Sequence, residues 1–154
     1  MFYLTIKTIH IISSVLLVGT GFGTAFYLYF ANRTKSVETI ANVSRLTVRA
    51  DWYFTAPTVV VQPLTGALMI WMAHWPLGMP WLLASIGLYA MAGACWLPVV
   101  VYQIRMARLA EAARREGTPL PDSYWRLARR WELLGYPAFL AMIAIYFLMV
   151  VKPA

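Results

Sequence analysis

The chain has 154 residues, of which 61% are hydrophobic and only 12% are charged. Soluble domains carry about 25% charged residues, so this composition excludes an ordinary water-soluble protein and indicates a single transmembrane domain over residues 1–154. The net charge of +7 comes from basic residues that flank apolar stretches. Because they form no compact basic domain with exposed aromatic residues, nucleic acid is excluded as a partner.

Long uncharged stretches define the predicted membrane spans. No charged residue lies between Lys7 and Arg33, and none lies between Trp52 and Ile104. The second stretch exceeds the ~20 residues of one crossing, and the segment HWPLGMPW at residues 74–81 divides it with two prolines and a glycine. The sequence therefore predicts an all-α, four-helix integral membrane bundle in the lipid bilayer, with spans near residues 4–31, 53–74, 81–104 and 133–151.

The basic residues predict the orientation. Connections 32–51 and 105–132 contain eleven of the 13 Lys and Arg residues, whereas the other side carries only Lys7 and Lys152. Short loops rich in Lys and Arg stay in the cytoplasm. We therefore expect a multi-pass protein with both termini on the non-cytoplasmic side.

The connection between the first two spans is itself predicted to be helical. Glu38, Asn42, Arg45 and Arg49 recur at helical spacing opposite apolar residues, which is typical of an amphipathic helix. That helix either lies in the headgroup plane or extends the second span. Asp51, an acidic residue at a span boundary, is expected to face headgroups.

Prolines inside the spans predict a cavity. Each proline removes a backbone hydrogen bond and can kink its helix, and carbonyls freed in a membrane must be covered by protein or by water in a cavity. The prolines are Pro57, Pro63, Pro98 and Pro137. The polar residues that either line such a cavity or bond between helices are Gln62, Thr65 and Gln103.

Lys7 and His10 lie one turn apart on an apolar helix. Lys7 can reach the interface with its long side chain, but His10 lies about 10 Å below the start of the helix. Ionisable groups in a membrane usually face the bundle interior. His10 is thus either a neutral imidazole hydrogen-bonded to another helix or the ligand of a haem or a metal ion.

A second axial ligand would need nearly the same depth as His10. His74 lies at the end of its span, and Met69 lies roughly 7–8 Å deeper, so Met69 matches better, followed by Met72. A five-coordinate site, or one His10 from each half of a homo-oligomer, also remains open.

Two segments resemble a known family. IKTIHIISSVLLVG and FLMVVKPA are similar to the first and last segments of HemJ-type protoporphyrinogen IX oxidases, in which a lysine precedes a histidine by three residues. The similarity is closer to a related family of predicted bacterial integral membrane proteins, in which ADWYFTAP, VQPLTG and ACWLPVV recur. That similarity covers nearly the whole chain.

The resemblance implies haem b near the outer leaflet of a bacterial cytoplasmic (inner) membrane. His10 would bind the iron, Lys7 would pair with a propionate, and Trp75 with Trp81 would flank the cofactor. Electron transfer with a quinone, or oxidase chemistry on a porphyrin, would follow. The oxidases carry a second histidine after a tyrosine in the third span, but this chain has Gln103 there, which argues against porphyrinogen oxidation.

Two other functions remain open on the sequence. A non-enzymatic scaffold or subunit would use the basic cytoplasmic face between Arg105 and Arg130 to bind anionic lipid or a partner protein. Transport of a small solute or metal is weaker, because no span contains the acidic residues of a cation path. Whether the protein is an enzyme is left open.

Overall fold

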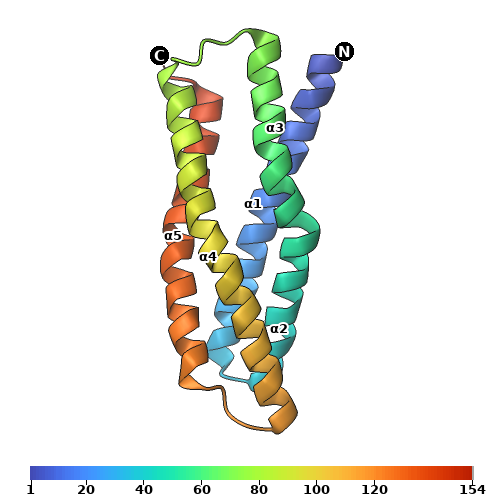
Figure 1. Cartoon of the computed structure of the whole chain (residues 1–154), viewed down its shortest axis with the longest axis vertical. Coiled ribbons are helices and arrows are strands. Elements are labelled where there is room, and N and C mark those ends of the chain that lie inside the picture. Colours follow the sequence, from blue (N-terminus) through green and yellow to red (C-terminus); the bar gives the residue numbers. More distant parts are fainter. Residues whose placement is uncertain (154) are drawn as a thin grey trace.

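The computed structural model describes residues 1–153, and these residues form a bundle of long helices whose termini lie at the same end (Figure 1). The elements are α1 (Phe2–Thr34), α2 (Val37–Ala50), the π-helical turn η1 (Asp51–Thr55), α3 (Ala56–Ala73), α4 (Pro80–Glu116) and α5 (Asp122–Val151). Within the described residues, four helical segments are long and apolar enough to cross a membrane. The predicted all-α four-helix membrane bundle is confirmed.

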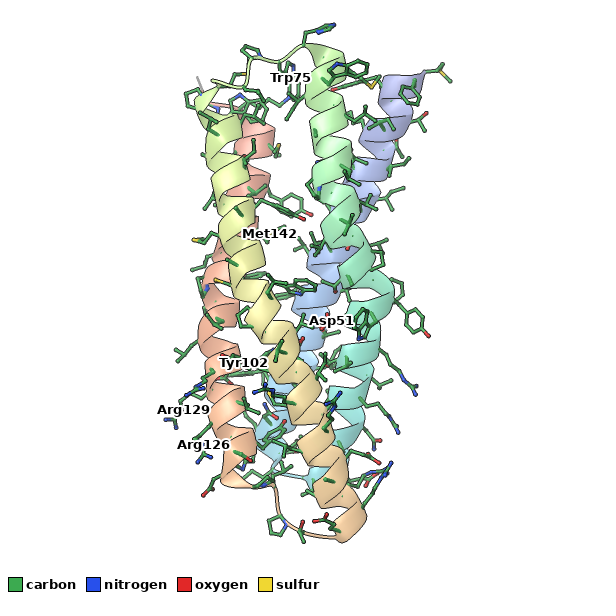
Figure 2. The ribbon with its side chains drawn as sticks, in the orientation of Figure 1. Asp51, Trp75, Tyr102, Arg126, Arg129 and Met142 are labelled. Atoms are coloured by element: carbon green, nitrogen blue, oxygen red, sulfur yellow. The ribbon has the colours of Figure 1, made fainter. Side chains whose placement is uncertain are left out.

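Helices α1, α3 and α4 each end at a residue whose backbone is left-handed. Lys35, His74 and Gly117 adopt left-handed conformations with φ of 55°, 52° and 65°, the usual way to terminate a helix. The end that holds both termini and residues 74–79 is called the terminal end, and the end that holds residues 35–36 and 117–121 is called the basic end. Arg126 and Arg129 project outward from α5 near the basic end (Figure 2).

The predicted amphipathic helix is present as α2, and it extends the second span instead of lying in the headgroup plane. It joins α3 through η1, where the amide of Ala56 donates to the carbonyl of Asp51 five residues earlier. Pro57 follows and has no amide to donate. Such a widened turn holds one extra residue and changes the direction in which the flanking side chains point.

The helices associate in two pairs: α1 packs along α3, and α4 packs along α5. At the basic end α2 joins the pairs, because it packs against both α1 and α4. The buried core lies there, and within it the Tyr124 hydroxyl donates to Asn32 Oδ1 at 2.6 Å. The two pairs are therefore held firmly at the basic end, and they enclose a space around the middle of the bundle.

Candidate functional site

A cavity of about 500 Å³ lies between the α1/α3 pair and the α4/α5 pair. This volume falls within the ~300–1,000 Å³ range of small-molecule sites. The lining is mainly apolar, and among the described residues nine aromatic side chains contribute to it: Phe22, Phe26, Tyr29, Phe30, Tyr89, Trp96, Trp131, Tyr136 and Phe139. A cavity inside the bundle is thus present, but none of the four intramembrane prolines from which it was predicted is among its lining residues.

Two contacts between the pairs bound this cavity. The Tyr89 hydroxyl on α4 donates to the carbonyl of Val59 on α3 at 2.7 Å. The rings of Phe22 on α1 and Phe139 on α5 stack with their centroids 4.8 Å apart. Helices α1 and α5 are not among the pairs that pack extensively within the described chain, and the lining rings of Phe22 and Tyr136 are 54% and 59% exposed. The cavity is therefore accessible from outside the bundle beside these two rings, and the Phe22–Phe139 stack lies across the gap between α1 and α5.

A chain of polar side chains forms part of the cavity wall. Asp51 accepts a hydrogen bond from the Thr55 hydroxyl at 3.0 Å. With the Gln103 amide oriented to satisfy both neighbours, its Nε2 donates to Asp51 Oδ2 at 2.7 Å and its Oε1 accepts from Trp131 Nε1 at 3.3 Å. This chain joins η1, α4 and α5 across the bundle.

These polar residues occupy one level, which is the edge of the uncharged part of the bundle. Asp51 directly precedes the uncharged stretch of the second span, Gln103 lies two residues before Arg105, and Glu132 directly precedes the apolar run of α5. Glu132 also lines the cavity. The carboxyl and amide groups of the cavity wall therefore lie at the edge of the uncharged stretches of the second, third and fourth spans, and the rest of the lining is mainly apolar.

The expectation that Asp51 faces headgroups is wrong. Its side chain is only 6% exposed, and it lies about half-way along the bundle (Figure 2). The widened turn η1 begins at this residue, and it directs the carboxylate toward α4. Gln103, expected either to line a cavity or to bond between helices, does both.

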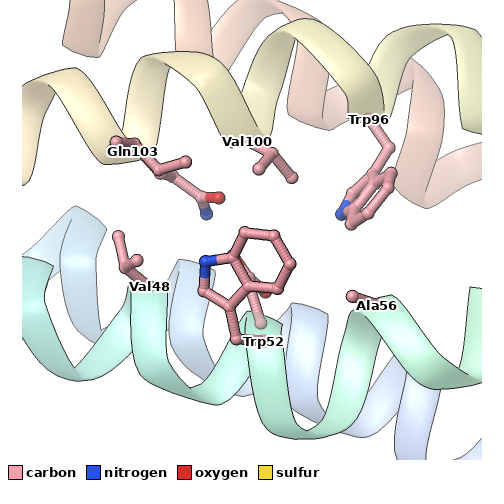
Figure 3. Close-up of a pocket in the computed structure, with 8 residues that line it drawn as sticks. Val48, Trp52, Ala56, Trp96, Val100 and Gln103 are labelled. Carbon is pink, nitrogen blue, oxygen red and sulfur yellow. The ribbon is translucent and has the colours of Figure 1, made fainter.

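A second, smaller cleft of about 70 Å³ lies on the other side of the same pair of residues. It separates α2, η1 and α3 from α4, and the indole of Trp52 lies between Gln103 and Trp96 (Figure 3). Asp51, Gln103 and Trp96 line both spaces. The Asp51–Gln103 pair therefore forms part of the wall between the cavity and the cleft.

The histidine that the sequence singled out lies elsewhere, between α1 and α3. His10 Nδ1 is 2.8 Å from Thr65 Oγ1, and His10 Nε2 is 3.2 Å from Gln62 Nε2. The Thr65 hydroxyl already donates to the carbonyl of Val61 at 2.7 Å, and a hydroxyl has one proton. Thr65 therefore accepts from Nδ1–H, and the lone pair of Nε2 accepts from the Gln62 amide.

This arrangement does not fit an axial haem ligand. Both ring nitrogens of His10 are engaged, and a side chain placed on Gly66 would lie 3.4 Å from His10 Cε1, so the two helices are closely packed there. His10 also lines neither of the two spaces described above. The interhelical hydrogen bond, which the sequence left open as the other role of His10, is the one found. Haem binding stays a prediction.

The remaining predicted site residues lie toward the terminal end of the bundle. Lys7 and His74 are exposed, and His74 is the left-handed residue that ends α3. Met69 is half-buried on α3, one turn from Thr65 toward the terminal end. None of the three lines the cavity.

Trp75 and Trp81 are paired with a side chain of the protein. Their rings meet edge to face with centroids 5.4 Å apart, and Lys152 Nζ lies 4.7 Å from the Trp75 ring and 5.7 Å from the Trp81 ring. The two indoles thus bind the end of α5 to the hairpin connection. This contact accounts for their position at the terminal end without a cofactor.

Sequence reasoning missed Asp51, Trp131, Glu132 and Tyr89 as site residues. One available signal was that Asp51, Gln103 and Glu132 each stand within two residues of the end of an uncharged stretch. Helices crossing the same bilayer place such boundaries at similar depth. Which way each side chain points could not be obtained from that signal.

Comparison with known proteins gives one family. The model of a predicted integral membrane protein family, DUF2269, matches residues 4–153. Compared with curated proteins and with solved structures, the chain shows no match. Because the family model covers nearly the whole sequence, the chain belongs to the DUF2269 family of predicted integral membrane proteins.

Proposed function

We propose that this protein binds a small, largely apolar molecule that it takes from the bilayer into the cavity between its helix pairs. The observation that carries the proposal is the cavity itself, about 500 Å³ in volume and lined by aromatic rings. A bundle with no ligand to bind would gain stability by filling such a space, since interiors are normally close-packed. The cavity is therefore best explained as a binding site.

The shape of the site supports entry from lipid. The rings of Phe22, Phe26 and Tyr136 line the cavity and are also exposed on the outer surface of the bundle, so a molecule dissolved in the bilayer would reach the cavity past them. The polar chain at Asp51 and Gln103 forms part of the cavity wall. An amphipathic molecule in the cavity would place its polar group against that chain.

This proposal differs from the redox function that the resemblance implies. A haem ligated by His10 would require Thr65 and Gln62 to release the ring. Quinones and porphyrins are ring molecules of the size class that the cavity admits, and the experiment below would identify either by its mass. A scaffold function through the basic face would leave the cavity without a role.

Three glycines on the cavity wall allow a direct test. Gly21, Gly93 and Gly135 line the cavity, and a side chain added at any of them would meet nothing within 4 Å. A leucine at position 93 would project into the space, and leucine favours helix formation over glycine by about 0.5–1 kcal/mol. Gly87 on the same helix is exposed, does not line the cavity and is equally unobstructed.

The measurement is native mass spectrometry of protein released from detergent micelles. We expect wild type and Gly87→Leu to carry the same co-purified small molecule, and Gly93→Leu to lose it while keeping its helical circular dichroism. A wild-type protein without any bound molecule, or an equal mass increase in Gly93→Leu, would refute the proposal.

A further inference from the structure

The charges on the cavity wall are all of one sign. Asp51 and Glu132 line the cavity, and none of the described lining residues is Lys, Arg or His. The chain as a whole carries a net charge of +7. The cavity is therefore an acidic site within a basic protein.

Neither carboxyl group has a cationic partner. Asp51 accepts from the neutral groups of Thr55 and Gln103, and no described Lys, Arg or His lies within ion-pair distance of it. Glu132 is half-buried and makes none of the hydrogen bonds or ion pairs of the described chain. The Asp51 carboxyl group is 6% exposed, and a buried carboxylate without a counter-charge is unfavourable; a cation in the cavity would offset that cost.

The aromatic lining adds an attraction of the same sign. The faces of Trp, Tyr and Phe rings carry partial negative charge and attract cations. One lining ring shows this with a group of the protein: the Arg33 guanidinium carbon lies 4.3 Å from the centroid of Tyr29. Arg33 is itself exposed and is not part of the lining.

We propose that the ligand of this cavity is a lipophilic cation, such as an aromatic amine or a quaternary onium ion, with its charge close to Asp51 and Glu132. This inference rests on the proposed binding function. It also specifies what the cavity disfavours, since carboxylated porphyrins and anionic lipids would place negative charge against two carboxyl groups. The chemistry of the ligand thus follows from the charge of the wall, and the size from the cavity.

Two probes of nearly the same shape and opposite charge test the charge preference. Tetraphenylphosphonium and tetraphenylborate each carry four phenyl rings around one central atom. Equilibrium dialysis of both against the full-length protein in a non-ionic detergent gives two dissociation constants. We expect the cation to bind at least tenfold more tightly than the anion.

Variants that remove one negative charge each test which carboxyl group causes the preference for a cation. Glu132→Gln keeps the shape of a side chain that makes no hydrogen bond, so the fold should survive, and we expect cation binding to weaken at least threefold. Asp51→Asn should weaken it about tenfold. Glu116→Gln removes the same charge from an exposed position at the end of α4 and should leave cation binding unchanged.

The outcomes separate the two proposals. Equal or tighter binding of tetraphenylborate, or unchanged cation binding in Glu132→Gln, overturns the cation inference. If both probes bind wild type with equal affinity and both are lost in Gly93→Leu, the binding function stands without the charge preference. If neither probe binds wild type, the cation inference fails, and native mass spectrometry alone decides the binding function.

Discussion

Gln103 Nε2 lies 2.7 Å from Asp51 Oδ2, and this contact joins α4 to the π-helical turn between α2 and α3. The same amide accepts from Trp131 Nε1 on α5 at 3.3 Å. One side chain therefore satisfies polar groups from two other helices at the edge of the cavity. Replacing Gln103 should therefore lower the stability of the protein.

We expect Gln103→Leu to lower the free energy of unfolding by about 1–3 kcal/mol, the cost of leaving buried polar groups without partners. The affected groups are Asp51 Oδ2 and Trp131 Nε1. Unfolding in mixed micelles of dodecyl sulfate, followed by circular dichroism, measures the loss. Tyr102→Phe, at the neighbouring position and with a hydroxyl that makes no hydrogen bond in the described chain, is the control. A loss below about 0.5 kcal/mol, the size of ordinary surface effects, would contradict the assignment.

The contact between His10 and Thr65 predicts energetic coupling between α1 and α3. Interhelical hydrogen bonds in membrane proteins contribute about 0.6 kcal/mol on average and up to about 1.7 kcal/mol. A double-mutant cycle of His10→Ala and Thr65→Ala should give a coupling energy in this range, because the two side chains bond directly at 2.8 Å. Additive effects of the two substitutions would show that the contact does not form in the membrane.

The same contact predicts the optical absorption of the purified protein. Because both nitrogens of His10 are engaged by Thr65 and Gln62, we expect protein purified from haem-replete cells in mild detergent to show no Soret band. Optical absorption before and after reduction with dithionite measures this. A stoichiometric Soret band that disappears in His10→Ala would contradict this account and support the redox function instead.

The buried core at the basic end predicts a further loss of stability. Tyr124 is fully buried and its hydroxyl donates to Asn32 Oδ1 at 2.6 Å. Tyr124→Phe should therefore destabilise the protein by about 0.5–1.5 kcal/mol, the net value of one hydrogen bond. Tyr136→Phe on the same helix removes an exposed hydroxyl with no hydrogen bond in the described chain and should have little effect. An equal loss of stability in the two variants would show that the hydrogen bond between Tyr124 and Asn32 does not stabilise the fold.

Much of the architecture could be predicted because it depends on where charge is absent. The hairpin connection at 74–79 follows from prolines and glycine between two uncharged stretches, and α2 follows from its amphipathic pattern. Both properties are local. They fix which residues are helical, but they do not fix which side of a helix meets another helix.

The candidate site depends on that missing information. An α-helix turns about 100° per residue, so the extra residue of η1 changes the direction of Asp51 by a large fraction of a turn. Gln103 contacts both Asp51 and Trp131 only because η1, α4 and α5 pack in one register. Likewise, the sequence shows that His10 lies within a span, but its partner could be an iron ion or a hydroxyl group. Only the packing of α1 on α3 shows that the partner is the Thr65 hydroxyl.

Photocrosslinking in intact membranes tests the central claim most directly. Phe139 lines the cavity, whereas Phe147 on the same helix is 63% exposed and does not, so p-benzoylphenylalanine is placed at either position and the adducts are weighed by mass spectrometry. The account predicts that position 139 yields an adduct with a small molecule that position 147 does not yield. Identical phospholipid adducts at both positions would show that the cavity is filled by bulk lipid and would contradict it.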